Sequence, residues 1–420
     1  MKKPAPLICL LTPGHLASTP RLLKEADALI DAGYRVQVVS GRHYPLAEPL
    51  DAGVLATARW ASTRVDFTGG VAVFLRKVLR RFARQLVTRA PFARISLAAR
   101  THHAESLHFG AVAARIPADF YLGHCLATLP AAAYAAKQRG VPYGFDIEDY
   151  HDGETLAAMG DSSEMVARRI LQSTLLPSCA HLTAAAPLIA AQYVQHYGVT
   201  PFTVLNVFPR AEAPAAPVDP GPITAQRPAK LYWFSQTIGK GRGIEAVLAV
   251  MARMRTPTEL HLRGIQKPGY GAQLQALATE LGVKYPIQFL DSGPAAEMAR
   301  LAASADLGLS TEETVPINRD VCLTNKIFTY LLAGIPQLLS ATSAQTALAP
   351  ELGDAGLLCD LSRPDATAAK LDAFFSNPER VANARRHAWE LGHGKFCWDT
   401  EQQQFLASIR HLVPLHSPTP

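Results

Sequence analysis

The chain has 420 residues, of which 48% are hydrophobic, and a formal net charge of +6. This length suits two domains of roughly 200 residues each, and no window approaches the roughly 18 uninterrupted apolar residues of a membrane-spanning helix. The six cysteines show neither a Cys-x-x-Cys pair nor zinc-ligand spacing to histidine, which argues against a zinc site and indicates reduced, cytosolic thiols.

The residues up to Gly41 predict a strand, a helix and a second strand, which is the seed of a parallel sheet. The apolar run "PLICLLTP" predicts the first strand, and "RVQVVSG" predicts the second. Between them, apolar residues recur at helical spacing after the start signal Ser18, Thr19 and Pro20. Two lysines before the first apolar run superficially suggest a secretory signal, but prolines interrupt that run, so we expect none.

Residues 71–100 carry much of the excess positive charge and predict an amphipathic helix. One alternative is that this helix lies on an anionic membrane surface, and the other is that it buries its apolar face in its own domain. Nucleic acid is not an expected partner, because no RNA-binding signature accompanies the charge. The apolar residues are Val71, Phe74, Leu75, Val78, Phe82 and Leu86, and the cations are Arg76, Lys77, Arg80, Arg81 and Arg84.

Strand-like and helical patterns alternate through the rest of the chain, which predicts an α/β fold. We expect two doubly wound Rossmann-like domains facing across a cleft, where open parallel sheets bind ligands. The predicted parts are an N-terminal domain at 1–208, a Pro- and Ala-rich linker at 209–229, a C-terminal domain at 230–395, and a helical segment at 396–420 that packs back on the N-terminal domain.

The stretch "SQTIGKGRGIE" joins a predicted strand to a predicted helix and combines three glycines with two cations. Glycines let the backbone approach a phosphate closely, and Lys240 and Arg242, which flank Gly241, would offset its charge. The alternative is a solvated loop with incidental charge. The spacing matches neither a Walker nor a Rossmann fingerprint.

The stretch "VCLTNKIFTYLLAGIP" predicts a helix that begins at Thr324 and Asn325 and stops at Gly334. Lys326 lies in its first turn, where positive charge is unfavourable against the helix macrodipole. A bound anion would resolve this conflict, whereas the alternative is an exposed surface lysine. Asn325 could cap the helix or contact a nucleotide.

The stretch "GFDIEDYHDGE" places several acids and a histidine directly after a predicted strand. Clustered acids raise one another's pKa unless cations or substrate hydroxyls intervene. We take Glu148, Asp149 and His151 as candidate catalytic residues, with a solvated acidic loop as the alternative.

Taken in order, these motifs resemble the GT-B glycosyltransferases, nearest the retaining family four. The resemblance rests also on "LLTPGHLASTPRLLKEADALIDAGYRVQVV" and on "SADLGLS" followed by "LTNKIFTYLLAGIPQLLS", and it covers nearly the whole chain. It implies sugar transfer from a UDP- or GDP-activated donor bound in the C-terminal domain. It implies no cofactor and no obligatory metal, which suits the lack of an Asp-x-Asp pair.

The resemblance also assigns roles to single residues. Arg242 matches a basic residue before glycine in the donor loop, and Lys326 matches the one that contacts the diphosphate. Gly14 falls on a glycine loop near the donor phosphate or acceptor, and His15 and His124 fall on the acceptor side.

The sequence departs from the family at two acidic positions. Family members carry two glutamates separated by seven residues, and here Val321 and Thr329 occupy those positions. Thr329 could still hydrogen-bond the ribose. Asp320, Glu312 or Glu313 could supply a carboxylate to the sugar, and adjacency favours Asp320.

We therefore expect a cytoplasmic, retaining glycosyltransferase with peripheral contact at the inner face of the membrane. It would act on a glycan or lipid-linked acceptor in surface polysaccharide or glycoconjugate synthesis. A sugar-nucleotide epimerase on the same fold and a non-catalytic GT-B scaffold are the alternatives.

Overall fold

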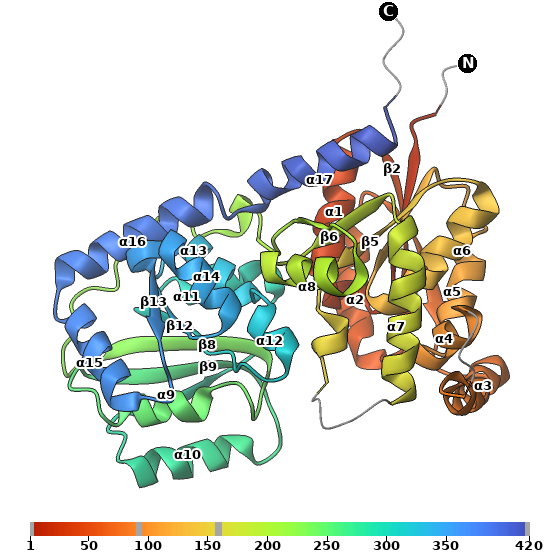
Figure 1. The fold of residues 1–420 in the computed structure, drawn as a ribbon. Coiled ribbons are helices and arrows are strands. Elements are labelled where there is room, and N and C mark those ends of the chain that lie inside the picture. Colours follow the sequence, from red (N-terminus) through yellow and green to blue (C-terminus); the bar gives the residue numbers. More distant parts are fainter. Residues whose placement is uncertain (1–3, 90–94, 156–161, 416–420) are drawn as a thin grey trace, which may run out of the picture. The chain divides into compact units, whose positions relative to one another are not determined.

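The computed structural model describes residues 4–89, 95–155 and 162–415, which form two compact units (Figure 1). The first unit comprises the described residues up to Val204 together with those from Gln402 onward, and the second runs from Leu205 to Glu401. Residues 1–3, 90–94, 156–161 and 416–420 lie outside the described residues. They include the two N-terminal lysines, part of the predicted 71–100 segment and the end of the predicted 396–420 segment.

The first unit is built on a seven-stranded, wholly parallel sheet with strand order β3-β2-β1-β4-β5-β6-β7. Leu10 of β1 pairs with Val38 of β2 and Leu122 of β4, so continuous apolar runs form the buried centre of the sheet. The strands are β1 Leu7–Thr12, β2 Arg35–Arg42, β3 Ala61–Asp66, β4 Phe120–His124, β5 Tyr143–Ile147, β6 His181–Ala184 and β7 Phe202–Thr203.

The helices of the first unit connect these strands. They are α1 Pro20–Asp31, α2 Glu48–Thr57, α3 Val71–Val87, α4 Ile95–His102, α5 Ser106–Ala113, α6 Leu129–Arg139, α7 Ser163–Leu175 and α8 Pro187–Tyr197. α17 (Trp398–Leu412) adds its part from Gln402 onward. The Tyr34 hydroxyl donates to the Val413 carbonyl (2.7 Å), which ties the end of the chain to this unit.

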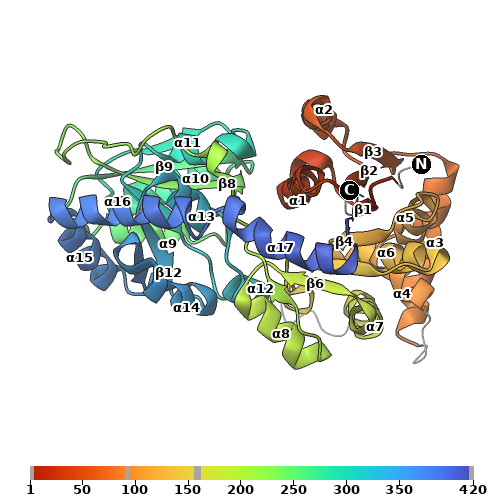
Figure 2. The same cartoon turned by 90° about the horizontal axis from the view of Figure 1, so that it is seen from above.

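The second unit has a six-stranded parallel sheet with order β10-β9-β8-β11-β12-β13. Its strands are β8 Ala229–Ile238, β9 Thr258–Gln266, β10 Ile287–Leu290, β11 Leu307–Ser310, β12 Gln337–Ser340 and β13 Gly356–Cys359. Its helices are α9 Ile244–Met251, α10 Tyr270–Leu281, α11 Met298–Ala302, α12 Ile317–Val321, α13 Asn325–Ala333, α14 Ser343–Leu352, α15 Pro364–Phe375 and α16 Pro378–His393. α13 is buried along most of its length and packs against α16 (Figure 2).

Both sheets confirm the predicted pair of doubly wound α/β folds. In each sheet the carboxyl ends of the strands meet at one edge, and the loops after β1, β4 and β5, or after β8 and β11, carry the candidate residues. The chain passes from one unit to the next at Val204 and Leu205. The Pro- and Ala-rich segment predicted as a linker belongs to the second unit, where the Arg385 guanidinium donates to the Val218 carbonyl (2.6 Å) and Arg227 pairs with Asp306 (2.9 Å).

The packing of α3 corrects one sequence-based alternative. A helix forms where it was predicted, but Phe74 and Phe82 on its apolar face are 65% and 58% exposed. A third face, with Val73, Ala83 and Val87, is the buried one. The alternative that this helix buries its apolar face in its own domain is therefore wrong. In the described part of the chain, no helix combines the length and apolar character that crossing a membrane requires.

Candidate functional site

In the first unit, four charged side chains lie buried together at the carboxyl ends of β4 and β5. The Arg21 guanidinium on α1 donates to both oxygens of Asp146, at 2.5 and 2.8 Å. His124, at the end of β4, places Nε2 3.1 Å from the Glu25 carboxylate and Nδ1 3.4 Å from Asp146. All four side chains are at most 1% exposed. Buried charges persist only when paired, and here Arg21 and His124 lie directly against the carboxyl groups of Asp146 and Glu25.

The pKa shifts in this network follow from burial and pairing. Burial lowers the pKa of His124, but Glu25, Asp146 and Glu148 outweigh it and raise that pKa well above 6.5. Burial raises the pKa of Asp146, yet Arg21 and His124 hold it far below its usual range. Burial raises the pKa of Glu25. The imidazolium of His124 and the carboxylate of Asp146 are therefore the charged forms at pH 7.

Glu148 is the part of this network that reaches solvent. Its carboxylate lies 3.4 Å from His124 Nδ1, and its side chain is 26% exposed. A carboxylate held by a buried imidazolium is oriented, so it can accept a hydrogen bond from a hydroxyl group. The structure thus brings two of the predicted site residues together.

The other acidic-loop candidates are engaged elsewhere. His151 is 7% exposed and lies 2.7 Å from Glu154, and its carbonyl accepts from Arg168. The Asp149 carbonyl accepts from the Tyr193 hydroxyl at 3.3 Å. These contacts fix the loop after β5, and the predicted catalytic roles of Asp149 and His151 stay predictions.

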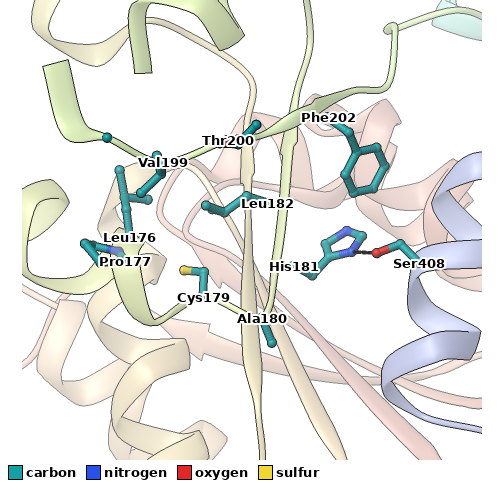
Figure 3. A pocket seen from close by; sticks show the side chains of 11 residues that line it. Leu176, Pro177, Cys179, Ala180, His181, Leu182, Val199, Thr200, Phe202 and Ser408 are labelled. Atoms are coloured by element: carbon teal, nitrogen blue, oxygen red, sulfur yellow. Dashed lines mark hydrogen bonds between the residues drawn. The ribbon is translucent and has the colours of Figure 1, made fainter. Parts of the chain in front are cut away.

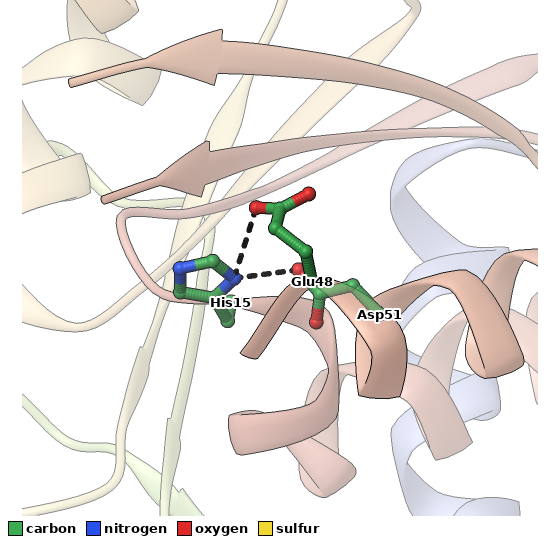
Figure 4. Close-up of side chains that lie close together, drawn as sticks. All are labelled: His15, Glu48 and Asp51. Atoms are coloured by element: carbon green, nitrogen blue, oxygen red, sulfur yellow. Dashed lines mark hydrogen bonds and ion pairs between the residues drawn. The ribbon is translucent and has the colours of Figure 1, made fainter. Parts of the chain in front are cut away.

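His15 sits in a second polar cluster, with Glu48 and Asp51 of α2 (Figure 4). Its Nδ1 lies 2.7 Å from Asp51, and its Nε2 accepts the backbone N–H of Tyr44 at 2.9 Å. We infer that Nδ1 carries the proton, because Nε2 is an acceptor. The two ring nitrogens therefore connect the loop after β1 to α2, through Asp51, and to the loop after β2, through Tyr44. The predicted acceptor contact of His15 stays a prediction.

Two groups in the described residues bring histidine and carboxylate atoms close enough to surround a cation: His15 with Glu48 and Asp51, and the Glu25, His124 and Asp146 set. Arg64 donates to both carboxylates of the first set, and Arg21 to Asp146 of the second. A guanidinium thus already supplies the positive charge in each set. The expectation that no metal is obligatory stays a prediction.

Gly14 lies in the loop after β1, as expected from the sequence. Its carbonyl accepts the N–H of Gly41 at 3.1 Å. A side chain at Gly41 would place its Cβ 2.0 Å from the Pro13 carbonyl oxygen, so the two loops can approach only because residue 41 is glycine. Sequence reasoning missed Gly41, although its position at the end of the second predicted strand was a usable signal.

In the second unit, the glycine-rich loop after β8 is fastened to the loop after β11. Gly241 and Gly243 have φ of 72° and 73°, and a Cβ on Gly243 would lie 2.3 Å from the Thr311 carbonyl oxygen. The Thr311 hydroxyl donates to the Arg242 carbonyl at 2.7 Å, and Arg319 donates to the Gly241 carbonyl at 2.5 Å. These bonds shape the loop through its backbone.

The predicted contact of Lys240 and Arg242 with a phosphate stays a prediction. The structure leaves the Lys240 side chain exposed and the Arg242 side chain partly exposed. Neither has an ion pair within 4 Å among the described residues, so their charges are available to an anion.

The first turn of α13 holds a buried ion pair. Lys326 is 8% exposed, and its Nζ lies 2.6 Å from the Glu312 carboxylate and 5.6 Å from the Trp233 ring centroid. Glu312 also accepts from the Thr324 hydroxyl (3.1 Å) and the Gln345 amide (2.6 Å). Glu312 therefore already places a negative charge beside Lys326. The position of Lys326 against the helix macrodipole does not by itself require a bound anion.

The positions of the missing glutamates are closed to a ligand-binding carboxylate. Thr329 is 1% exposed and donates to the Asn325 carbonyl at 2.9 Å, and Val321 is 5% exposed on α12. Asp320 accepts from the Ser343 N–H (2.8 Å) in the first turn of α14, whose N-cap residue is Thr342.

Of the three carboxylates considered from the sequence, Glu312 is the one beside the first turn of α13. In the sequence, Asp320 was favoured because it is adjacent to Val321, and the short helix α12, which separates Glu312 from α13 along the chain, was not foreseen. The signal that could have found it is its place directly after the strand β11.

A pocket of about 370 Å³ lies near the start of β6, bounded by the start of β7 and by Ser408 of α17 (Figure 3). His181 lies 2.9 Å from the Ser408 hydroxyl, and burial lowers the pKa of His181 to about 4. Burial raises the pKa of Cys179 to about 12, which makes its thiol unreactive. The lining therefore offers no charge to a phosphate at pH 7.

Comparisons with known proteins relate the chain to others by structure. No family model matches the sequence, and no curated protein matches it. HepE from Anabaena, solved in complex with UDP and glucose, is 15% identical with a TM-score of 0.70, covering 97% of this chain and 100% of that one. Sucrose-phosphate synthase from Thermosynechococcus elongatus is 14% identical with a TM-score of 0.69, covering 97% and 99%.

A UDP-forming trehalose-phosphate synthase from Burkholderia xenovorans is 13% identical with a TM-score of 0.61, covering 97% of this chain and 99% of that one. At such low identity these matches establish the fold and leave the chemistry open. The chain has the GT-B fold, as the resemblance implied.

Proposed function

We propose that the chain is a glycosyltransferase that transfers a hexose-like sugar from a UDP-sugar to a glycan or lipid-linked acceptor. The observation that carries the proposal is the buried Glu312–Lys326 pair at the first turn of α13, beside the glycine-rich loop after β8. HepE, which has the same fold, was solved with UDP and glucose, and this favours UDP over GDP.

The second unit binds the donor in this proposal. Lys326 and Arg242 contact the diphosphate and stabilise the negative charge that develops on the leaving group. Glu312 takes the place of the family's carboxylates and accepts hydrogen bonds from sugar hydroxyls, since its side chain is already oriented by Thr324 and Gln345. Charge neutralisation by these side chains requires no metal ion.

The first unit binds the acceptor. Glu148, oriented by His124, accepts a hydrogen bond from the attacking hydroxyl. The anomeric configuration is retained, with an oxocarbenium-like centre as the nucleotide diphosphate leaves and with the leaving phosphate accepting the acceptor proton. We place the reaction in surface polysaccharide or glycoconjugate synthesis.

Calorimetric titration with UDP, UDP-glucose and GDP tests the donor, followed by turnover measured with and without a panel of acceptors. We expect UDP-sugar binding and acceptor-dependent release of UDP. Conversion of the donor to another nucleotide sugar would favour an epimerase, and binding without turnover would favour a scaffold. Failure to bind any nucleotide overturns the proposal.

We also propose peripheral contact with the anionic inner face of the membrane, from the cytoplasm, through α3. The exposed Phe74, Leu75 and Phe82 side chains provide an apolar face beside the cations of the same helix. The test is co-sedimentation with vesicles of phosphatidylglycerol and of phosphatidylcholine.

Replacement of Phe74 and Phe82 by Ser should abolish sedimentation with the anionic vesicles. The matched control replaces Tyr134 and Val194, which are each 48% exposed on other helices of this unit, by Ser. Equal binding of both double variants would end the idea.

A further inference from the structure

A pocket of about 640 Å³ opens beside α3 in the first unit. This volume falls within the range of about 300–1,000 Å³ that is common for small-molecule sites. Pro13 and Gly14 line it from the loop after β1, His43 from the loop after β2, and Phe67 from the end of β3. It therefore lies at the carboxyl ends of three adjacent parallel strands, the edge at which α/β sheets bind ligands.

The wall formed by α3 is strongly cationic. Lys77, Arg80, Arg81 and Arg84 follow one another at three- and four-residue spacing, so they share one face of the helix, and all four line the pocket. Arg80 is fixed in place, because it donates to the carbonyls of Thr101 (3.0 Å) and His102 (2.7 Å).

The negative charge at the pocket is smaller. Glu105 lines it, but Glu105 is paired with Arg76 at 2.5 Å. Glu164 lies 3.7 Å from Arg80 and is shared with His102 at 2.5 Å. Lys77 and Arg81 have no ion pair within 4 Å among the described residues. Burial, together with His102 and Arg80, lowers the pKa of His103 to about 4, so this ring adds no charge at pH 7. The cations of α3 outnumber the carboxylates at the pocket, and the resulting positive field suits an anion.

The same helix presents its apolar face to solvent. Phe74, Leu75, Leu79, Phe82 and Leu86 are 44% to 65% exposed. A second copy of this chain is a poor partner for α3, because symmetric association would bring two rows of cations together. A ligand that satisfies both faces has an anionic group and a hydrocarbon chain.

We propose that this pocket binds the phosphate or diphosphate group of a lipid-linked acceptor, whose hydrocarbon chain runs along the exposed apolar face of α3. The proposal rests on the proposed function and names its acceptor class. Lys77 and Arg81 contact the phosphate oxygens, and Arg80, which is fixed by its bonds to two backbone carbonyls, adds a positive charge at a defined place. The lipid leaves the pocket toward the membrane on which α3 lies.

The test is calorimetric titration of the full chain with farnesyl diphosphate, inorganic pyrophosphate and farnesol, below micelle-forming concentrations and without vesicles. We expect farnesyl diphosphate to bind about tenfold more tightly than pyrophosphate, and farnesol to bind more weakly than either. Tight pyrophosphate binding with no gain from the farnesyl chain, or preference for a single-stranded oligonucleotide, would overturn the lipid assignment.

Substitutions test whether farnesyl diphosphate binds in this pocket. Replacing Lys77 and Arg81 by Gln should weaken farnesyl diphosphate binding about tenfold or more. The matched control replaces the exposed Arg115 and Lys137 by Gln, which changes the net charge equally away from the pocket. Equal affinities of the two double variants would refute the site.

A further double variant, with Phe74 and Phe82 changed to Ser, should keep pyrophosphate affinity and lose the gain from the farnesyl chain. UDP affinity, measured on the same samples, separates the two proposals. Retained UDP binding without any farnesyl diphosphate binding refutes this inference alone, whereas loss of both refutes the proposed function as well.

Discussion

The Glu312→Gln substitution tests the site most directly, because it removes one negative charge and keeps the size of the side chain. Both oxygens of Glu312 accept hydrogen bonds from Thr324, Lys326 or Gln345, so a glutamine must present its NH₂ group to at least one donor. The two side chains of the ion pair are only 10% and 9% exposed, so solvent screens them little. Breaking a buried pair in this way should reduce the free energy of unfolding by about 3 kcal/mol.

The same substitution should discriminate between the sugar and the nucleotide. If Glu312 accepts a hydrogen bond from a sugar hydroxyl, its loss removes about 2 kcal/mol from UDP-glucose binding, which is roughly a 30-fold increase in Kd. UDP alone lacks the sugar, and the loss of the anion beside Lys326 acts equally on the diphosphate of both ligands, so the sugar contact appears as a roughly 30-fold change in the ratio of the two Kd values. Calorimetric titration of both ligands measures the difference, and thermal unfolding measures the stability.

The matched control is Glu313→Gln. Glu313 is adjacent, its side chain is 47% exposed, and it forms an ion pair with Arg319 that spans 3.9 Å. We expect its substitution to change stability by less than about 1 kcal/mol and to leave both affinities intact. Equal loss of UDP and UDP-glucose affinity in Glu312→Gln, or no loss of either, would refute a sugar contact by Glu312.

Three further predictions concern single positions. Gly243→Ala should destabilise the chain by about 3 kcal/mol and weaken UDP binding, whereas Gly282→Ala, with a similar φ of 74° but nothing near its Cβ, should lower stability by only about 1 kcal/mol; equal unfolding temperatures would contradict this. Since the pKa of His124 is raised, its protonated ring stabilises the fold below about pH 6.5 and this stabilisation is lost as pH rises through the folded pKa. Denaturant titrations should show stability falling above pH 7 by up to about 1.4 kcal/mol per pH unit, and His124→Gln should flatten that slope; an unchanged slope would place the titration elsewhere. Thr329→Val should change stability by less than about 1 kcal/mol and leave UDP affinity unchanged, because its buried hydroxyl donates to the Asn325 carbonyl; a tenfold loss of affinity would instead support the ribose contact expected from the sequence.

The sequence was sufficient for the elements that carry strong periodic signals. The buried runs at Leu7–Thr12 and Leu307–Ser310 contain few polar residues, and each precedes a helix that the sequence predicts, Pro20–Asp31 after the first and Asn325–Ala333 after the second. The strand Ala61–Asp66 was missed, because most of its residues are polar and at least partly exposed and only Val65 is buried, a pattern that resembles a loop. The helix Ile317–Val321 was also missed, since five residues are too few to show a helical period.

The site was less predictable, because its key contacts join residues far apart in the chain. Glu312 meets Gln345 across a β-strand and two helices, and Arg21 meets Asp146 across most of the first unit. No local pattern encodes such pairs. The amphipathic pattern of α3 was visible, but periodicity alone cannot say which face a domain covers, and the small residue Ala83 marks the covered face.

Both units bury an ion pair at the carboxyl ends of their strands: Arg21 with Asp146 in the first, and Lys326 with Glu312 in the second. Apolar residues of similar volume would often stabilise a fold as well or better, so stability alone does not explain such pairs. Each pair does fix a carboxylate or cation in a defined orientation at the edge where α/β sheets bind ligands. A polar substrate that binds there meets groups that are already oriented, and it does not have to order them itself. A double variant with apolar residues in place of Lys326 and Glu312 should therefore keep the fold and lose the donor, which separates the stabilising role of the pair from its binding role.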